Sequence, residues 1–511
     1  MNKKIQNLGI VPLILATSVS CSSSKKEKKT NQNELPNIVL LMGDDHGWDE
    51  VGYNGHPYVK TPVLDEMAAS GLRFDRFYAA HPSSSPTRGS VLTGRHPNRY
   101  GTFTPGFSLR PEEITIAHIL KKAGYATAHF GKWHVGPVKK ESPTSPGAMG
   151  FDEWLSHDNF FEIDPVLSRN GETPQKYEGE GSEVIIDATI EFIKKSKNQK
   201  RPFLAVVWFG SPHEPYSGLP EDLALYDNLP DSLANKNVHL TSNETGLPVT
   251  RPLRNVLQER YAEITAMDRA IGKLRTFLNK NDLKENTLVM YCGDNGTPAE
   301  AGRTGMTLRG QKGNLYEGGI RVPCVLEWPV KIKEPSSTSV LSSTSDLLPT
   351  LAEITGQSLP ERPIDGISLV PFLNDPAKQR TEPLYFWMFE YGKVFGKDAE
   401  PYIKMELQEG TTPTVKIMDG KFTRTFYNFK YDRISEKDFY GVRAVMKDRF
   451  KLIAEGQNPN SKGFELYDIQ NDPEEKTNLA DEYPEMVDEM RAELHKWQES
   501  VLNSLTGADY Q

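Results

Sequence analysis

The chain has 511 residues, of which 37% are hydrophobic and 25% charged, a composition typical of ordinary globular proteins that argues against a disordered or membrane-embedded chain. Its length suits one large α/β domain plus a smaller one. The formal net charge of −9 argues against nucleic acid as the main partner, because proteins that bind phosphate backbones normally carry a basic excess. A small anionic substrate in a local cationic pocket stays compatible with this charge.

The N-terminal segment is predicted to be an export signal and a tether. Two lysines precede an apolar run over 8–16, which is too short to span a membrane as a helix and is followed by Cys21. This order resembles a bacterial lipoprotein start, with 1–21 as signal peptide and Cys21 as the lipid-bearing residue. The polar stretch 22–36 predicts a flexible tether. We expect an exported protein of a Gram-negative bacterium, periplasmic or associated with the outer membrane through this lipid.

Four near-continuous apolar runs are each followed by polar residues. Such runs are typical of strands in a parallel sheet that is covered on both faces. Because ligands bind beyond the carboxyl ends of these strands, the residues that follow are candidates for a site. The runs, each with its polar residues, are 38–42 with Asp44 and Asp45, 126–130 with Lys132 and His134, 203–209 with His213, and 288–292 with Asp294 and Asn295.

Helix-like segments with helix start and stop signals lie between these runs. Strands that alternate with helices predict a doubly wound, mostly parallel α/β domain over 37–375, with a hinge at 371–383. The remaining residues, 376–511, predict a smaller α+β subdomain with an antiparallel sheet. The predicted helices are 61–71, 114–124, 256–278, 346–356 and 484–502, and hairpin strands are expected at 440–444 and 450–453.

Besides Cys21, the chain contains Cys292 and Cys324, both in apolar, strand-like runs. The simplest interpretation is two small buried hydrophobic side chains. A disulfide is an alternative in an oxidising compartment, although two cysteines do not make a disulfide framework.

Asp44, Asp45, Asp294 and Asn295 place four oxygen-bearing side chains after two of the predicted strands. Oxygen ligands of this kind suit Ca²⁺ or Mg²⁺. Three adjacent carboxylates repel one another unless a cation is bound. Either motif alone is compatible with a solvated loop end, but the matched pair favours a metal site.

The stretch 84–88 reads Ser-Ser-Pro-Thr-Arg and is followed by Thr-Gly-Arg at 93–95. Pro86 near a first helical position predicts a turn into a helix. A helix N-terminus with Arg88 one turn in suits an anion, whereas an ordinary helix cap is the alternative.

Together these motifs resemble the formylglycine-dependent (type I) sulfatases, whose signature is Cys or Ser followed by x-Pro-x-Arg and Thr-Gly-Arg. The resemblance covers nearly the whole mature chain and implies an alkaline-phosphatase-like fold. Partner motifs occur in the family's order: Asp44-Asp45, 131–134, 212–213, 294–296, 308–313 and 318–323, then 465–468 and 472–475 toward the C-terminus.

Many family members carry Cys where this chain has Ser84, so the resemblance implies the serine-type branch. Ser84 would be oxidised to 3-oxoalanine (formylglycine) by a serine-type maturase, a transient partner, and an unmodified serine would leave the protein nearly inactive. The resemblance also implies one Ca²⁺ per chain, with ligands from Asp44, Asp45, residue 84, Asp294 and Asn295.

The resemblance further implies roles for the basic residues. Arg88, Lys132 and Lys312 would offset developing negative charge while a hydroxyl of the hydrated residue 84 attacks sulfur. His213, with Lys312, would protonate the leaving oxygen, and His134 would then accept the proton whose removal releases sulfate. Lys132, His213 and Lys312 would also contact substrate. Read without the family, each histidine or lysine is equally compatible with an ordinary loop residue.

The expected substrate is a sulfated carbohydrate, such as a mucin O-glycan or a glycosaminoglycan fragment. The segments 157–160 and 300–307 are expected to line its pocket. One alternative function is a related metal-dependent hydrolase of phosphate mono- or diesters. Another is a surface lipoprotein that binds sulfated glycans without turnover because Ser84 stays unmodified.

Overall fold

The computed structural model describes Met1 and residues 35–242, 245–390, 400–414, 423–431, 433–454 and 463–510. The predicted signal peptide, with Cys21, and nearly all of the predicted tether lie outside the described residues. Within the described part of the chain, no helix has the length and apolar character needed to cross a membrane.

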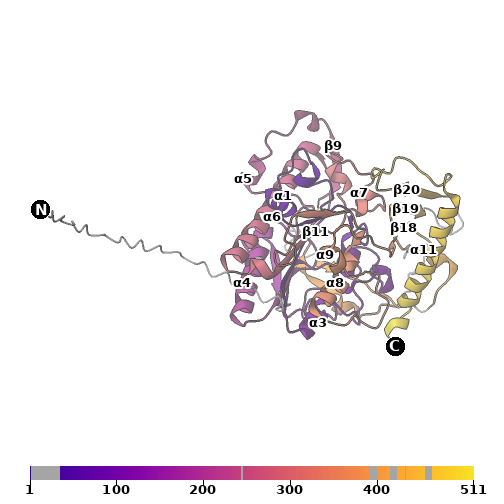
Figure 1. Ribbon diagram of the computed structural model, residues 1–511, viewed down its shortest axis with the longest axis horizontal. Coiled ribbons are helices and arrows are strands. Elements are labelled where there is room, and N and C mark those ends of the chain that lie inside the picture. The colour runs from indigo at the N-terminus through magenta and orange to yellow at the C-terminus, as the bar shows by residue number, and fades with distance from the viewer. Residues whose placement is uncertain are drawn as a thin grey trace.

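A ten-stranded mixed sheet forms the larger part of the molecule (Figure 1), in the order β13-β2-β12-β11-β1-β8-β4-β5-β6-β7. Its five central strands run parallel, and four of them are the predicted apolar strands. The central strands are β11 (Thr287–Gly293), β1 (Asn37–Gly43), β8 (Phe203–Trp208), β4 (Ala126–Lys132) and β5 (Glu153–His157). On either side lie β12 (Cys324–Glu327), β2 (Leu72–Phe74), β13 (Ser336–Thr338), β6 (Val166–Arg169) and β7 (Gln175–Lys176).

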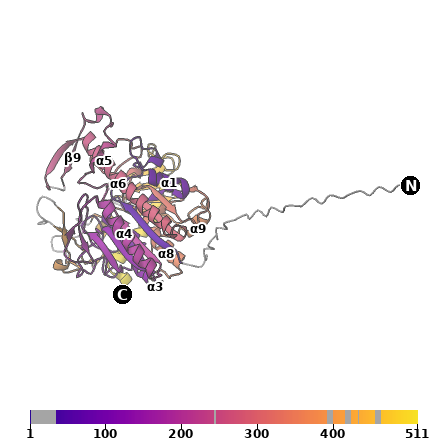
Figure 2. The same cartoon turned by 90° about the vertical axis from the view of Figure 1, so that its left-hand side faces the viewer.

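Helices cover both faces of this sheet because successive side chains of each central strand point to opposite sides. Val39 and Leu41 of β1 join a core with α1 (Pro62–Ser70), α4 (Gly181–Asn198) and α6 (Leu253–Lys280). Leu40 and Met42 join the opposite core with α2 (Ser84–Thr93), α3 (Ile116–Lys122) and α8 (Leu347–Thr355). The layers are visible in Figures 1 and 2, and they confirm the predicted doubly wound α/β class.

A second, antiparallel sheet lies toward the C-terminus, at the right of Figure 1. It contains β15 (Leu384–Trp387), β18 (Arg443–Lys447), β19 (Phe450–Ala454) and β20 (Phe464–Asp468), and α11 (Pro484–Leu505) packs on it through Leu494 and Trp497. The predicted C-terminal α+β region with an antiparallel sheet is therefore confirmed. The exact division between residues 375 and 376 stays a prediction.

A separate two-stranded hairpin, β16 (Glu409–Pro413) and β17 (Thr423–Thr425), was not anticipated from the sequence. It is tied to the loop after α2, since the Ser108 amide donates to the Tyr427 carbonyl at 2.9 Å and the Tyr427 amide donates to the Gly106 carbonyl at 2.8 Å. The remaining short elements are β3 (Phe77–Tyr78), β14 (Ser342–Ser343), β9 (Asn237–Thr241), β10 (Pro248–Pro252), α5 (Pro220–Ala224), α7 (Glu317–Ile320) and α9 (Val370–Asn374).

One predicted strand is displaced: the strand expected at 440–444 begins only at Arg443. Gly441 has a φ of +105°, and a Cβ there would lie 2.1 Å from the Met388 carbonyl oxygen. A glycine-specific turn therefore precedes the strand.

The two described cysteines face each other, since Cys292 of β11 pairs in register with Cys324 of β12. Both are buried and free, so the interpretation as buried hydrophobic side chains is confirmed and the disulfide alternative is wrong.

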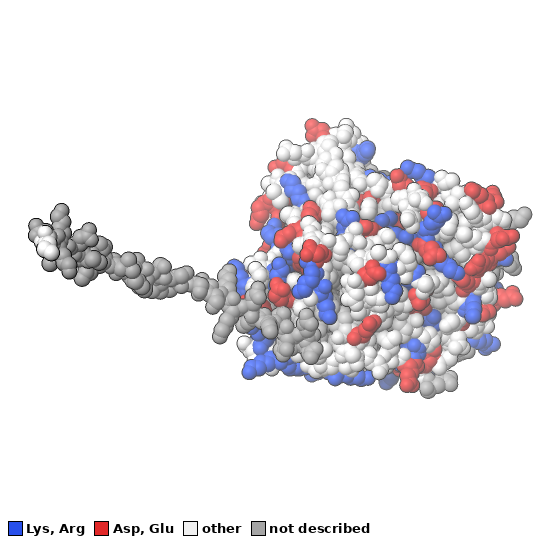
Figure 3. Space-filling model, viewed as in Figure 1, with Lys and Arg blue, Asp and Glu red and all other residues white. Residues whose placement is uncertain are grey.

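Acidic and basic side chains are interspersed over the face of the molecule that Figure 3 shows. Where side chains of both signs lie close together on this face, their long-range fields partly cancel.

Candidate active site

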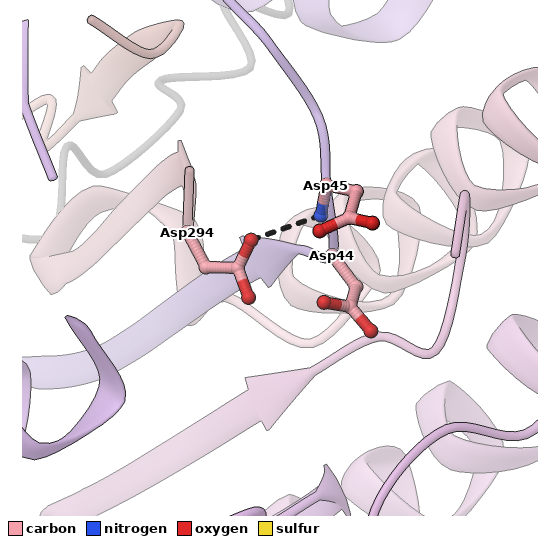
Figure 4. A group of neighbouring side chains, drawn as sticks. All are labelled: Asp44, Asp45 and Asp294. Carbon is pink, nitrogen blue, oxygen red and sulfur yellow. Dashed lines mark hydrogen bonds between the residues drawn. The ribbon is translucent and has the colours of Figure 1, made fainter. Parts of the chain in front are cut away.

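Three buried carboxylates meet where two neighbouring parallel strands end (Figure 4). Asp44 and Asp45 follow β1, and Asp294 follows β11. One oxygen of each lies within 4.8 Å of the others, and the side chains are at most 1% exposed. Asp45 adopts a φ of 59°, a conformation that Asp tolerates better than most residues, and its amide donates to Asp294 Oδ1 at 2.9 Å. The local turn thus brings two consecutive aspartates to the third.

Ser84 is the first residue of α2, and its hydroxyl faces this carboxylate group. Its Oγ donates to Asp44 Oδ1 at 3.2 Å and lies 3.3 Å from Asn295 Oδ1. Ser83 occupies the cap position, without a side-chain capping hydrogen bond. The side chain of Ser84 therefore does not cap the helix; it contacts the carboxylate group. Every residue of α2 is buried.

Each carboxylate has a cationic partner. Lys132 Nζ donates to Asp44 Oδ2 at 2.6 Å, and Lys312 Nζ donates to Asp45 Oδ2 at 2.7 Å. Arg88 donates through Nη2 to Asp294 Oδ2 at 2.8 Å and lies 3.3 Å from Asp44 Oδ1. The structure thus brings all three predicted cations to the predicted metal ligands. We call these paired side chains the floor of the site: Asp44, Asp45 and Asp294 with Lys132, Lys312 and Arg88.

The pKa values in this floor reflect burial and charge together. Burial alone raises the pKa of Asp44, but the charges of Lys132, His213 and Arg88 outweigh it and lower that pKa far below its usual value. Burial, and then repulsion by Asp44, raise the pKa of Asp294 to about 7, and burial lowers the pKa of Lys132 to about 8. Burial is the larger cause of the raised Asp294 pKa, and a divalent cation bound beside this carboxyl would favour its ionised form.

The donor set fits a hard cation. Asp44, Asp45, Asp294, Asn295 and residue 84 supply five oxygen-bearing side chains, and the three carboxylates are the one His/Cys/Asp/Glu group of this geometry among the described residues. Ca²⁺ takes six to eight oxygen ligands, so a bound ion leaves positions for substrate or water.

His134 and His213 lie beside the floor in different environments. His134 is 3% exposed, and neither ring nitrogen has a hydrogen-bond partner among the residues that the structure describes. Burial lowers its pKa well below the usual value, so the ring is neutral and can accept a proton. His213 contacts the Glu214 carbonyl through Nδ1 at 2.5 Å, and its Nε2 lies 3.7 Å from Asp45 Oδ2. Burial lowers its pKa to about 4, against the opposing effect of Asp45 and Asp44.

A supporting ion pair behind the floor was not found from the sequence. Arg260 of α6 donates to the Asp45 carbonyl at 2.7 Å and to the Pro212 carbonyl at 2.5 Å, and it pairs with Glu50 at 2.6 Å. This arginine therefore joins the loops that carry Asp45 and His213. Its place on a long amphipathic helix gives no signal that distinguishes it from an ordinary partly buried arginine.

The segment 157–160, expected to line a pocket, does contact the site and also the β16–β17 hairpin. Phe160 stacks on His213, with ring centroids 5.2 Å apart and planes at 7°. His157 Nε2 contacts the Pro413 carbonyl at 3.2 Å, and Asp158 accepts from the Val138 amide at 2.7 Å. Phe160 thus faces the site, whereas His157 and Asp158 hold neighbouring chain segments.

The other expected pocket segment, 300–307, forms hydrogen bonds with residues that follow β1. Thr307 Oγ1 donates to Asp49 at 2.9 Å, and the Thr304 carbonyl contacts His56 Nε2 at 3.3 Å. A pocket role for this segment stays a prediction.

Comparisons with known proteins agree with this geometry. Residues 36–357 match the model of the sulfatase family. The chain is 33% identical to arylsulfatase A of Homo sapiens over 377 residues, covering 69% of this chain and 70% of that protein. It is 30% identical to an ulvan-active sulfatase of Formosa agariphila over 375 residues, covering 72% and 71%. A solved structure of a protein in complex with its substrate D-glucosamine-2-N,6-O-disulfate has the same fold, with a TM-score of 0.68, 21% identity, and coverage of 94% and 100%.

The fold is of the alkaline-phosphatase-like α/β class. Within that class the chain belongs to the sulfatase family, and it is therefore a hydrolase of sulfuric esters. The resemblance inferred from the sequence motifs is confirmed.

Proposed function

We propose that this sulfatase releases inorganic sulfate from sulfated sugars, with a formylglycine derived from Ser84 and one Ca²⁺. The observation that carries this proposal is the position of the Ser84 hydroxyl, 3.2 Å from Asp44 Oδ1 and 3.3 Å from Asn295 Oδ1. A nucleophile on residue 84 would lie directly at the proposed cation.

Ca²⁺ would be held by Asp44, Asp45, Asp294, Asn295 and an oxygen of residue 84, where it would supply Lewis-acid polarisation of the sulfate. Lys132, Lys312 and Arg88 would place positive charge around the sulfate oxygens, because all three already reach the same floor.

The two histidines would divide the proton transfers. While an oxygen on residue 84 attacks sulfur and the bond to the sugar oxygen breaks, His213 would donate the proton that this leaving oxygen needs, assisted by Lys312. A bound sulfate ester adds negative charge near His213 and so favours its protonated form. The hydrated aldehyde of residue 84 would carry two hydroxyl groups, one of which has attacked sulfur. His134 would then accept the proton of the second hydroxyl, the carbonyl would re-form, and sulfate would leave. A plain serine has no second hydroxyl and would retain the sulfate.

The proposed substrates are sulfated sugars, including mucin O-glycans and glycosaminoglycan fragments. Support comes from the ulvan-active relative and from the fold shared with a protein whose substrate is a sulfated glucosamine. The experiment is a panel of defined sulfated saccharides with measurement of released sulfate. Turnover of aryl sulfate alone, with none of the saccharides hydrolysed, would contradict the proposed substrate class.

The two alternatives from the sequence are less well supported. In the described part of the chain, the candidate metal group contains three aspartates and no histidine, which does not match a two-metal phosphate hydrolase with histidine ligands. Comparing aryl sulfate with aryl phosphate turnover tests this point. A binding-only lipoprotein would require Ser84 to stay unmodified, and mass spectrometry of the mature protein tests that.

The proposed maturation and location follow from the same function. We propose that a serine-type maturase acts on Ser84 and that the protein is exported and lipidated at Cys21. Labelling with a lipid precursor, comparing the natural chain with Cys21→Ala, tests the anchor.

A further inference from the structure

The β16–β17 hairpin lies beside the candidate active site and is fixed there by one carboxylate. Asp158, which follows β5, accepts from the Thr411 amide at 2.7 Å, the Thr412 amide at 2.8 Å and Thr412 Oγ1 at 2.7 Å. It also accepts from the Val138 amide, in the segment after His134. The hairpin is therefore joined to the chain segment that carries His134, although about 280 positions separate them in sequence.

Arg424 of β17 and Phe426, which directly follows this strand, lie near His134. The ring of Phe426 lies 6.4 Å from the ring of His134. Alternate residues of an extended strand share a face, so Arg424 projects to the same side as Phe426. The charge of Arg424 contributes to lowering the pKa of His134, which is consistent with this placement.

The Arg424 guanidinium is half-buried and has no hydrogen-bond or ion-pair partner in the described part of the chain. Burial lowers its pKa, as expected for a desolvated cation without a counter-charge. Arg88 and Arg260, by contrast, are each paired with a carboxylate. Gly106 leaves room for the Arg424 side chain, because a Cβ at that position would lie 3.1 Å from Nη2.

A half-buried, unpaired guanidinium beside a catalytic group is costly unless a ligand supplies the missing anion. The fork of Arg donors matches a carboxylate or a sulfate. In the proposed mechanism the scissile sulfate is bound by Arg88, Lys132 and Lys312, which share the floor with the carboxylates. Arg424 belongs to the β16–β17 hairpin and not to the segments that carry the floor, and it has no carboxylate partner in the described part of the chain.

We propose that Arg424 is a specificity-determining residue that binds a second anionic group, a carboxylate or another sulfate, on the saccharide that carries the scissile sulfate. This inference rests on the proposed function and narrows its substrates to polyanionic saccharides.

The test measures binding without turnover, by calorimetry on Ca²⁺-loaded protein with Ser84→Ala. Two matched probe pairs separate the sources of the second anion. N-acetyl-D-glucosamine-6-sulfate and D-glucosamine-2-N,6-O-disulfate differ in a sulfate. A 6-sulfated hexosamine–uronate disaccharide and its carboxyl-reduced form differ in a carboxylate. We expect the second anion to tighten binding about 10- to 100-fold in at least one pair, the range for a charge-assisted hydrogen-bonded contact.

Adding Arg424→Gln should remove the preference for the second anion while changing the affinity for the mono-anionic probe less than about threefold. Arg424→Lys should restore part of that preference, because lysine keeps the positive charge but lacks the paired donors of the guanidinium. Arg449→Gln is the matched control, since Arg449 is an exposed arginine of the C-terminal sheet. Thermal unfolding of each variant verifies folding.

Several results would overturn the inference: no preference for the second anion with Arg424 present, no binding of any probe, or an equal loss for both members of a pair in Arg424→Gln. The last result would place Arg424 at the scissile sulfate or in a purely structural role. Failure of the proposed function is distinguishable, because it would appear as absence of sulfate release by the mature protein on every ester tested.

Discussion

The floor of the site differs from His134 and Arg424 in how completely its polar and charged groups are paired. In the floor, Asp44, Asp45 and Asp294 each have a cationic partner within 2.8 Å. In the rim, which we define as His134, His213 and Arg424, the ring nitrogens of His134 have no partner and Arg424 has no counter-charge among the described residues. A paired floor is organised before substrate binds, whereas the rim is completed by the substrate. Changes in the floor should therefore affect all substrates, whereas changes at His213 and Arg424 should affect some substrates more than others.

The largest effect is expected for Ser84→Ala, which removes the proposed nucleophile. Activity should fall by about 10⁴-fold or more on every sulfate ester, because residues that act as one catalytic unit fail together. Ser83→Ala, one position away, should change the rate only a few-fold. Mass spectrometry of the active natural protein should show that the residue-84 peptide has lost two hydrogens. Turnover by protein whose residue 84 is wholly unmodified serine would exclude this nucleophile.

The next largest effect is expected for the metal ligands. Asp44→Ala and Asn295→Ala should each lower kcat/KM by about 10²- to 10³-fold by loosening the cation. EDTA should inhibit the natural protein, and Ca²⁺ should restore it better than Zn²⁺. Ca²⁺ should also raise the Tm of the natural protein and raise it less in both variants. Full activity after rigorous removal of divalent ions would remove the metal from the mechanism.

His134→Ala should slow sulfate release from residue 84, with either class of substrate. We expect a burst of released alcohol followed by turnover lowered about 10²-fold, and an added sulfate mass on the residue-84 peptide. Rapid-quench kinetics and peptide mass spectrometry check this. A lowered rate with neither burst nor adduct would assign His134 to orientation of the sulfate.

His213→Ala should separate the substrates by their leaving groups. A sugar alkoxide leaves poorly and needs protonation, so kcat/KM for a sugar sulfate should fall by about 10²-fold or more. An aryl sulfate with an acidic phenol should lose less than about tenfold. Equal losses for both would mean that His213 does not donate the proton. Phe160→Leu, which removes only the stacking ring, should show no such discrimination.

The smallest effect is expected for Asp158→Asn, which weakens the attachment of the hairpin. We expect a loss of about 1–3 kcal/mol in stability, because both carboxyl oxygens of Asp158 accept hydrogen bonds and the NH2 group of asparagine cannot accept any. Burial raises the pKa of the Asp158 carboxyl above its usual 3.8, so the native state binds this proton more tightly than the unfolded chain does. Its contribution to stability is present below pH 3.8 and declines as the pH rises through the folded pKa. Thermal unfolding from pH 4 to pH 8 should therefore show a smaller gap between natural protein and variant at the higher pH.

The sequence predicted the parallel strands and the floor because both depend on local patterns. Apolar runs such as 288–292 identify a strand, and the residues after it must lie at the carboxyl edge of the sheet. The pattern of the sequence alone therefore places Asp294 and Asp44 together. Ser84 and Lys312 were placed by the family motifs rather than by pattern.

The rim and its supports could not be predicted in the same way. Arg424 reaches His134 through a hairpin whose position depends on long-range hydrogen bonds to Asp158, and no local pattern encodes those contacts. Arg260 likewise reads as one more residue of an amphipathic helix, although it joins two loops of the site. The strand β18 starts later than predicted because of the turn at Gly441. Glycine is required there because the Met388 carbonyl approaches closely, and this is a tertiary contact that the local sequence does not reveal.

The burial of α2 also bears on whether Ser84 can be modified before or after the protein folds. Ser84 is 1% exposed, at the start of a helix enclosed on every side. All residues of α2 after Ser84 are buried as well, so a second enzyme cannot bind them in the folded molecule without local unfolding. We therefore expect the maturase that we propose to act on Ser84 during synthesis or export, before the domain folds. The fraction of active protein should then depend on the relative rates of Ser84 oxidation and of folding.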